Sequence, residues 1–408
     1  MKRTLIILSL WCCLCSPGQA DSLAISTSTP SPTVSSSAFA ITSVSASTTS
    51  VDISTAAFPA ERIIHGIHLT ASAAGSKKYR QKLDTMFAET MINTVVVDMK
   101  EEEGQVYVPG VKAAERCKAY ERAVPDLEPW LADLKKRGIY TVARIVVFKD
   151  NRMPRYDKSM AVHNAQGELW FDRHKITWLD PFNHEGWRYN ILVALQAAKL
   201  GFDEVQFDYI RFPTDGDLKV MRFSQPRSKA SEALAGFLRE AAQVLHPLGV
   251  KISIDVFGLT TSVNSGMGIG QHLSSMAAQV DYVCPMTYPS HYAKGEYGIP
   301  NPNDQPYRTL HFAMRDALKA LGPEGAHKLR PYLQDFSLKG RGIRYRAKEV
   351  RAQMQAAADL GVPSWTLWNA NCHYTFEAIK TPIVAQNLSV FTTGQTASAP
   401  SLPDGKHP

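Results

Sequence analysis

The chain has 408 residues, of which 44% are hydrophobic and 20% are charged, as is typical of a globular protein with a sizeable core. Its formal net charge of +7 is small for this length, and its Lys and Arg residues are scattered along the sequence. This distribution argues against a nucleic-acid-binding protein, which would cluster basic residues on one face. A weak positive charge remains compatible with acidic glycan surfaces.

The first 20 residues have the pattern of a secretory signal peptide. Lys2 and Arg3 precede an apolar run that ends at Leu14, and the small residues Gly18 and Ala20 suit a cleavage site after Ala20. The apolar run is too short to span a bilayer, and no later stretch is apolar for long enough. We therefore predict an exported protein, periplasmic or extracellular, with no transmembrane segment.

Two further segments have the composition of disordered chain. Residues 21–60 are dominated by Ser, Thr, Ala and Pro, and residues 386–408 look similar. Such segments cannot bury enough apolar surface to offset the entropy lost on ordering. We predict a linker, one globular domain over residues 61–385, and a disordered tail.

The globular region alternates strands with helices. Strands are expected at 63–69, 94–98, 140–148, within 202–213, and at 250–256, 280–286, 329–334 and 363–368. Helices are expected at 79–90, 127–136, 187–199, 229–245, 269–278, 307–320 and 347–360, with a long insertion over 149–181. Eight such alternations fit a (β/α)8 TIM barrel with long loop insertions. The rival is a doubly wound open sheet, which would be favoured by a glycine-rich phosphate turn that residues 69–72 do not provide.

The stretch from Phe202 to Pro213 is the most informative strand. Polar and apolar residues alternate through it, and its far end carries Asp208 and Arg211. In α/β barrels the catalytic residues stand at the C-terminal ends of strands. The alternative is a salt bridge between these two residues that only fixes a loop, and the segment alone leaves both interpretations open.

The same strand-end rule gives the other candidate site residues. They are His68, Asp98, Lys100, Arg144, Asp255, Tyr288, Asp335, Trp368 and Asn371. Their spacing matches no metal-ligand motif, so we expect no metal and no cofactor. Cys117, Cys284 and Cys372 match neither a disulfide framework nor a zinc motif, so buried free thiols are expected, with a single bridge left open.

Paired carboxylates beside aromatic side chains are typical of glycoside hydrolysis. One carboxylic acid protonates the leaving oxygen, and a second carboxylate attacks the anomeric carbon or activates water. Trp170, Trp178, Trp365 and Trp368 are candidate floors for sugar rings, although a core position is the commoner outcome for each of them. Trp365 and Trp368 are three residues apart on one strand, so only one of them can face the barrel mouth.

Three blocks of sequence resemble a known family. They are residues 178–181 (Trp-Leu-Asp-Pro), 198–213, which include Phe-Asp-Tyr-Ile-Arg-Phe-Pro, and 331–336 (Pro-Tyr-Leu-Gln-Asp-Phe). They are similar to the family of secreted bacterial TIM-barrel proteins described as "putative glycoside hydrolase", a domain of unknown function, over residues 63–379. The resemblance implies a barrel related to the α-amylase-like glycosidases and a carbohydrate activity.

That relationship also suggests roles. α-Amylase-like barrels have an Asp nucleophile after strand 4, a Glu acid/base after strand 5 and a further Asp after strand 7, and Asp208, Asp255 and Asp335 hold the matching positions. The chain departs from the pattern because strand 5 carries Asp, and because Arg211 follows the strand-4 aspartate instead of preceding it.

We therefore predict that Asp208 is the nucleophile, which Arg211 keeps ionised, and that Asp255 is the acid, with a raised pKa. An Asx turn is the alternative for Asp255. Asp335 is expected to bind a hydroxyl or stabilise the transition state, and Asp98 and Lys100 to pair with each other or bind substrate.

Two more acids receive structural roles. Asp180 is expected to organise the long loop or cap the next helix, and Glu204, near the start of its strand, to serve stability.

Three functions are compatible with this pattern. The first is an exported glycoside hydrolase acting on a polysaccharide or oligosaccharide. The second is a carbohydrate-binding barrel of the cell envelope without catalysis. The third is another hydrolase such as a deacetylase, which would need metal ligands that the sequence does not display.

Overall fold

The computed structural model describes residues 62–322 and 325–383. The predicted signal peptide, the whole of the predicted linker and the predicted C-terminal tail lie outside these residues.

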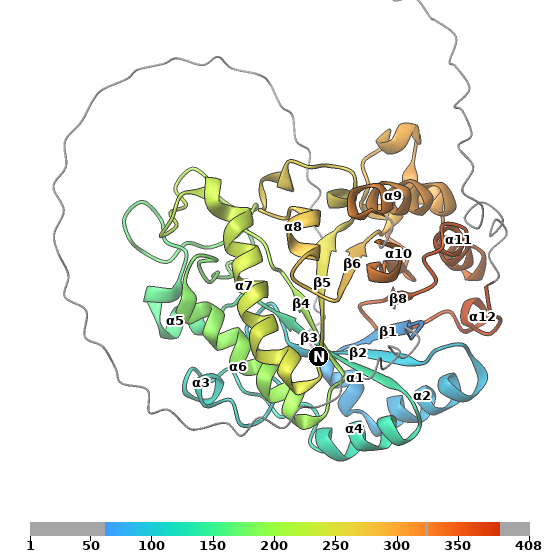
Figure 1. Cartoon of the computed structure of the whole chain (residues 1–408), viewed down its shortest axis with the longest axis horizontal. Helices are drawn as coiled ribbons and strands as arrows, with labels where there is room; N and C mark the ends of the chain where they lie inside the picture. Colours follow the sequence, from blue (N-terminus) through green and yellow to red (C-terminus); the bar gives the residue numbers. More distant parts are fainter. Residues whose placement is uncertain (1–61, 323–324, 384–408) are drawn as a thin grey trace, which may run out of the picture. The chain divides into compact units, whose positions relative to one another are not determined.

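Eight parallel strands close into a barrel in chain order (Figure 1). They are β1 (His65–Leu69), β2 (Thr94–Lys100), β3 (Tyr140–Val146), β4 (Glu204–Asp208), β5 (Lys251–Phe257), β6 (Tyr282–Met286), β7 (Tyr332–Gln334) and β8 (Trp365–Trp368). Each strand pairs in parallel with the next, and β8 returns to pair with β1. The TIM-barrel prediction is confirmed, and the doubly wound open sheet is excluded.

Helices surround this barrel (Figure 1). They are α1 (Ala71–Gly75), α2 (Lys77–Glu89), α3 (Lys112–Arg116), α4 (Leu127–Lys136), α5 (Met153–Tyr156), α6 (His184–Leu200), α7 (Ala230–Leu245), α8 (Leu273–Ala277), α9 (Pro306–Leu321), α10 (Gly325–Lys328), α11 (Ala347–Ala358) and α12 (Phe376–Ile379). Short 3-10 turns stand in the loops, among them η4 (Gly258–Thr261) and η6 (Pro289–His291). Among the described helices, none is both long and apolar enough to cross a bilayer.

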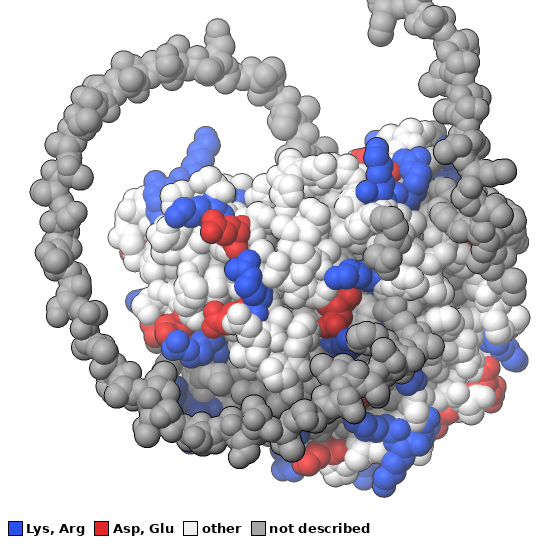
Figure 2. Space-filling model, viewed as in Figure 1, with Lys and Arg blue, Asp and Glu red and all other residues white. Residues whose placement is uncertain are grey.

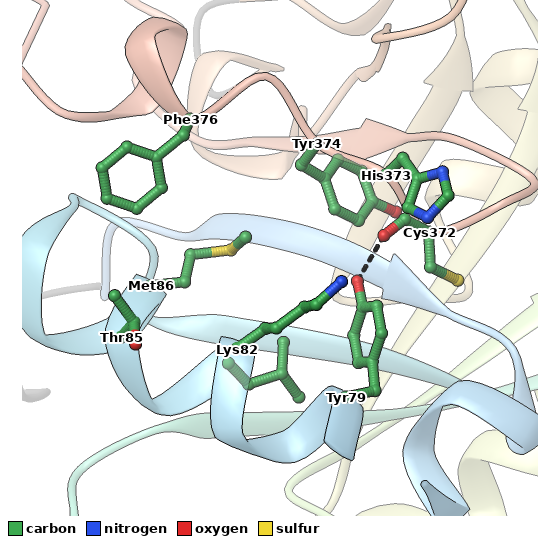
Figure 3. Close-up of a pocket in the computed structure, with 9 residues that line it drawn as sticks. Tyr79, Lys82, Thr85, Met86, Cys372, His373, Tyr374 and Phe376 are labelled. Atoms are coloured by element: carbon green, nitrogen blue, oxygen red, sulfur yellow. Dashed lines mark hydrogen bonds between the residues drawn. The ribbon is translucent and has the colours of Figure 1, made fainter.

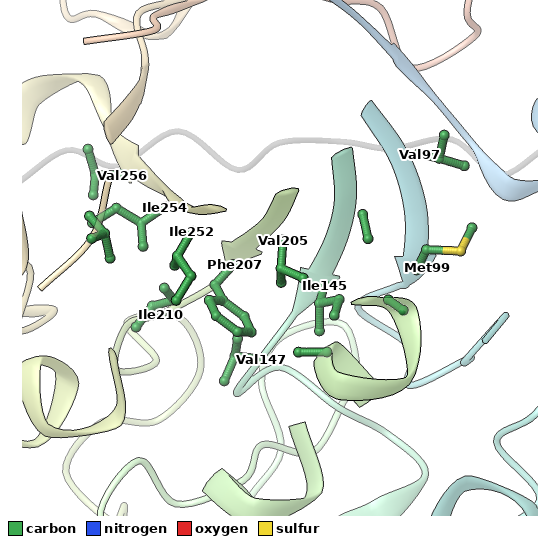
Figure 4. Packing of buried hydrophobic residues seen from close by; sticks show 14 of the residues in the cluster. Val97, Met99, Ile145, Val147, Val205, Phe207, Ile210, Ile252, Ile254 and Val256 are labelled. Carbon is green, nitrogen blue, oxygen red and sulfur yellow. The ribbon is translucent and has the colours of Figure 1, made fainter. Parts of the chain in front are cut away.

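Alternation along the strands separates an apolar outer face from a polar interior. On β4, Val205 and Phe207 pack outward with apolar residues of β3 and β5 (Figure 4), and both are fully buried. Burial of a side chain such as Phe207 contributes about 2 to 3 kcal/mol. The alternate residues of the strand, Glu204, Gln206 and Asp208, therefore face the barrel interior.

Inside the barrel, polar side chains bond to one another in layers. Near the strand starts, Glu204 pairs with Arg330 at 2.7 Å and accepts a hydrogen bond from the Tyr140 hydroxyl at 3.0 Å. One layer above, the Tyr332 hydroxyl donates to Gln206 Oε1 at 2.6 Å. Glu204 thus lies in a buried ion pair below the barrel mouth, in keeping with the structural role predicted for it.

Helix α6 leads the chain into β4, and both of its ends are capped. The Asn183 side chain accepts from the Gly186 N–H at 3.0 Å at the start. Gly201 ends the helix with φ 106°, a left-handed conformation that favours glycine. This glycine cap fixes where α6 ends and β4 begins.

The long insertion after β3 folds against the loop after β4. Backbone bridges join Lys149 to Trp178 and His163 to Arg222. Asp180 accepts from the Phe182 N–H at 3.0 Å and the Ser224 N–H at 2.7 Å, so it organises the loop as predicted.

Charged side chains of both signs are mixed on the face seen in Figure 2. All three cysteines of the described region are buried and free.

Candidate active site

Arg144 lies at the centre of three aspartates that come from neighbouring strands. Its Nη1 donates to Asp98 Oδ1 at 2.6 Å. Its Nη2 and Nε donate to Asp208 Oδ2 at 2.5 and 3.1 Å, and Nε is 3.6 Å from Asp255 Oδ2. None of these four residues is more than 4% exposed. Strands β2 to β5 thus bring together three of the predicted acids around one cation.

The two carboxyls predicted to be catalytic are close to each other. Since Oδ2 of Asp208 and Oδ2 of Asp255 both lie within 3.6 Å of the same Nε, they are at most about 7 Å apart. This upper bound includes the roughly 5 to 5.5 Å that separates the two carboxyl groups of retaining glycosidases. Among the described residues, no group of His, Cys, Asp or Glu is arranged to hold a metal ion.

The surroundings move the pKa values of the aspartates in opposite directions. Burial and the nearby Asp208 carboxylate raise the pKa of Asp255 well above its usual value, and Arg144 offsets this only in part. For Asp98, burial acts to raise the pKa, but His68 and Arg144 outweigh it and lower the value. The surroundings therefore favour the protonated form of Asp255 and the charged form of Asp98.

His68 and Trp368, from β1 and β8, cover this network. The His68 ring stacks on the Trp368 ring at 3.9 Å, and His68 Nε2 bonds to Asp98 Oδ2 at 2.9 Å. The Arg144 guanidinium lies 5.1 Å from the Trp368 ring centroid. Trp368 is partly exposed, whereas Trp365 is only 2% exposed and stacks on His65. Only one of the two tryptophans therefore reaches the mouth, as predicted.

The other two candidate tryptophans belong to the core of the insertion. Trp170 is 3% exposed and Trp178 is fully buried, so neither offers a free face to a sugar.

Tyr288, after β6, completes the ring of aromatics around the carboxyls. It packs edge-on against Phe336 at 5.6 Å and lies 6.5 Å from Trp368. Burial, together with the charges of Asp255 and Asp208, raises its pKa well above the usual value. Its phenol therefore stays neutral and can donate a hydrogen bond.

Arg211 does not pair with Asp208, and this corrects the prediction that Arg211 keeps the aspartate ionised. Tyr209 between them has φ 51°, a left-handed conformation that turns the chain sharply after β4. The carboxylate is instead held by Arg144, which points into the barrel from the neighbouring strand. The pairing of Arg144 with Asp208 could have been anticipated from the sequence, because alternation along β3 places Arg144 on the inner face of the barrel.

Lys100 is also placed differently from the prediction. The register between β2 and β3 shifts between Asp98 and Lys100, so a β-bulge turns Lys100 away from the aspartate. Its fully buried ammonium pairs with Asp150 at 2.9 Å and donates to the Val146 carbonyl at 2.7 Å. The expectation that Lys100 pairs with Asp98 or binds substrate is wrong, because its donors are used within the fold.

Asp335 and Asn371 do not join the carboxyl cluster. Tyr332 points into the barrel, so Asp335, three residues later, faces the other way. Its Oδ1 and Oδ2 accept from the Thr375 hydroxyl at 2.6 Å and the Thr375 N–H at 2.7 Å. Asp335 thus anchors the loop after β8, which corrects its assignment as a catalytic residue. Asn371 is exposed on the same loop, where its N–H donates to Asn369 Oδ1 at 2.9 Å.

The sequence analysis missed Glu101 and Glu102, which directly follow β2. Both are partly exposed, and burial together with the Asp98 charge raises the pKa of Glu101 to about 7. A carboxyl with that pKa can give or take a proton near neutral pH. The strand-end rule would have found this pair had it been extended two residues past Lys100.

A pocket of about 340 Å³ opens elsewhere, between α2 and the loop after β8 (Figure 3). It is lined by Tyr79, Lys82, Leu83, Thr85, Met86, Cys372, His373, Tyr374 and Phe376. The Tyr79 hydroxyl donates to the Cys372 carbonyl at 2.5 Å across it. No predicted site residue lines this pocket, so it is distinct from the carboxyl cluster.

Residues 66–374 match a family described as "Putative glycosyl hydrolase domain". No curated protein sequence matches the chain. Among solved structures, the glycoside hydrolase domain of PgaB (BpsB) from Bordetella bronchiseptica aligns with a TM-score of 0.61 and 14% identity, over 78% of this chain and 98% of that one. A cycloalternan-degrading enzyme from Trueperella pyogenes aligns with a TM-score of 0.51 and 14% identity, over 80% of this chain and 46% of that one.

A hypothetical protein from Ruminiclostridium thermocellum shares 34% identity over 47% of this chain and 97% of its own, with a TM-score of 0.43. At 14% identity, the likeness to the two carbohydrate-active enzymes shows the barrel fold alone.

Proposed function

Since the chain belongs to the family described as "Putative glycosyl hydrolase domain", we propose that it cleaves glycosidic bonds of a polysaccharide through a pair of carboxyls. The observation that carries this proposal is the contrast between Asp208 and Asp255. Asp208 accepts hydrogen bonds from two nitrogens of Arg144, whereas the pKa of Asp255 is raised well above its usual value. A glycosidase needs one anionic and one protonated carboxyl on either side of the scissile bond.

In this mechanism Asp208 attacks the anomeric carbon or stabilises the positive charge that develops there. Asp255 donates its proton to the leaving oxygen. Arg144 holds both carboxyls in position, and the neutral Tyr288 hydroxyl is a donor to the sugar. The partly exposed Trp368 ring offers a flat apolar surface for stacking.

The first test is Asp208→Asn. The amide cannot act as a nucleophile or carry negative charge, so we expect kcat/KM to fall by about 10³-fold or more. The fold should survive, because loss of the Asp208 charge lets Asp255 ionise and replace it beside Arg144. Activity is measured on whichever polysaccharide a glycan screen identifies, with thermal unfolding followed in parallel.

Asp335→Asn is the matched control, because that carboxyl lies outside the cluster. It should lower the unfolding temperature while kcat per folded molecule stays near the wild-type value. A fully active Asp208→Asn variant would overturn the mechanism.

A second function, carbohydrate binding without catalysis, is favoured by one observation. All three aspartates around Arg144 are at most 4% exposed, which limits their access to a substrate. A wild-type protein that binds a glycan but never cleaves it, with binding lost in Trp368→Ala, would support this reading.

We also propose that the protein acts outside the cytoplasm, because residues 1–20 have the pattern of a signal peptide. N-terminal sequencing of the protein recovered from the periplasm or the medium should find Asp21 first. Recovery of intact Met1 from the cytosol alone would contradict export.

A further inference from the structure

Arg211 is a half-buried cation with no carboxylate partner among the described residues. The buried cations of the same barrel are all paired: Arg144 with Asp98 and Asp208, Lys100 with Asp150, Lys149 with Asp172, and Arg330 with Glu204. For Arg211, no Asp or Glu oxygen of the described region lies within 4.0 Å of the guanidinium. Within the described part of the chain, its one hydrogen bond runs from Nη1 to the Phe212 carbonyl at 3.3 Å.

Three aromatic rings hold this guanidinium in place. They belong to Trp178, Tyr209 and Phe257, whose centroids are 4.9, 5.0 and 5.1 Å from Cζ. They come from the insertion, from the turn after β4 and from the end of β5. A second cation, Lys149, lies 5.3 Å from the Tyr209 ring.

The nearby acids are engaged elsewhere or stand apart. Asp208 is bonded to Arg144, and Asp172 accepts from the His174 and Ile176 N–H groups of its own loop. Asp215 is partly exposed on the loop after β4 and makes no ion pair with Arg211. The guanidinium is thus held by the three rings, and most of its five N–H donors have no partner among the described residues.

The charges of Asp215, Asp208 and Asp172 act on Arg211 from a distance, but a neutral sugar would leave it without a carboxylate at ion-pair distance. A guanidinium taken partly out of water is costly without a counter-ion, and burial lowers the pKa of Arg211. The fork of N–H groups matches a carboxylate, which accepts two parallel hydrogen bonds. The aromatic rings add apolar surface for the ring of the same sugar.

We propose that Arg211 binds the carboxylate of an acidic sugar beside the carboxyl cluster, so that the substrate is an anionic polysaccharide. This inference rests on the proposed function, but it can be tested separately from cleavage.

The experiment compares acidic oligosaccharides with carboxyl-reduced forms of the same chains. Uronate-containing oligomers of polygalacturonate, alginate and hyaluronan serve as probes, each beside its neutral reduced form and a sulfated neutral glucan. Binding is measured by calorimetry, and cleavage by product analysis. We expect at least one acidic probe to bind about tenfold or more tighter than its reduced form, the value of one charge-assisted hydrogen bond.

The variants separate charge from packing. Arg211→Met keeps the side chain against the three rings but removes the charge, and it should erase the preference for the acidic form. Arg211→Lys should retain only part of the preference for the acidic form, because an ammonium keeps the charge but cannot donate two parallel hydrogen bonds. Arg315→Gln is the control, since Arg315 stacks on Phe312 at 4.9 Å on the outer helix α9. A thermal melt of each variant shows that it is folded.

The outcomes distinguish the anion site at Arg211 from the glycosidase activity. Tighter binding of an acidic probe without cleavage would support the anion site and contradict the glycosidase. Cleavage of neutral probes with no preference for the acidic forms would support the glycosidase and overturn the anion site. A preference for the sulfated glucan alone, or a preference that survives in Arg211→Met, would also overturn it. No binding to any acidic probe would overturn the anion site, while the glycosidase would still be tested on the polysaccharide that the glycan screen identifies.

Discussion

Asp255 shows at the residue scale how a site can cost stability. The carboxyl is 1% exposed, and its Oδ1 has no hydrogen-bond partner. It lies beside another carboxylate, so its ionised form is disfavoured in the folded state. Such groups are retained for activity although the fold would be more stable without them.

We therefore expect Asp255→Asn to be inactive but more stable than the wild type at neutral pH, by about 1 to 2 kcal/mol. Since the folded pKa is raised, the carboxyl contributes no penalty below its usual pKa, where folded and unfolded chains are both protonated. As pH rises, the unfolded chain ionises first, so wild-type stability falls. The gain in Asp255→Asn should grow from pH 4 to pH 7 in urea unfolding.

Asp281→Asn is the control with the opposite sign. Burial acts to raise the pKa of Asp281, but bonds from Lys251, the Ile252 N–H and His246 lower it overall. Its stabilising effect is present above the usual pKa and is lost as pH falls through the lowered value. Asp281→Asn should thus destabilise the fold at pH 7. A destabilised Asp255→Asn at pH 7 would contradict our account of the cluster.

Glu101 gives a pH dependence that can be measured. Its pKa of about 7 predicts that, if it donates a proton, kcat/KM falls as pH rises through about 7. Glu101→Gln should abolish that limb of the profile and lower the maximum. Glu103→Gln, an exposed acid two residues away, is the matched control and should leave the profile unchanged. An unaltered profile in Glu101→Gln would exclude Glu101 as the group that titrates.

At the scale of elements, the bulge in β2 is a feature that could not be predicted from the sequence. Apolar periodicity and strand ends were enough to predict eight strands, the barrel and the convergence of Asp98, Asp208 and Asp255. A bulge leaves no trace in composition, so Lys100 was assigned to the wrong face. The pairing of Asp208 with Arg144 was not predicted either, because it depends on the register between β3 and β4. Arg211 was chosen as the partner because it is close to Asp208 in sequence.

Lys100 should therefore behave as a structural residue. Lys100→Met leaves Asp150 buried without its cation, which we expect to lower the free energy of unfolding by about 3 kcal/mol or more. The double variant Lys100→Met/Asp150→Asn should recover part of that loss, because no charge remains unpaired. Unfolding in urea measures both. A single variant of wild-type stability that no longer binds glycan would restore the substrate-binding role.

At the scale of the whole molecule, the described residues form one closed barrel. A short digestion with a nonspecific protease should trim both ends and leave a fragment close to residues 62–383. Mass spectrometry identifies the fragment, and digestion in denaturing urea is the control that should leave none. A cut that divides the barrel into two independently folding halves would contradict the single domain.

The pairing of β8 with β1 has a consequence for the order in which this chain can fold. The Ile64 N–H donates to Ser364 Oγ, 300 residues away, and His65 pairs with Trp365. Closing so long a loop is slow, and until it closes β1 presents an open edge to other chains. The native barrel cannot form while its last strand is still on the ribosome. Under the export that we propose, late closure would keep the polypeptide unfolded until its last strand has passed through the export channel.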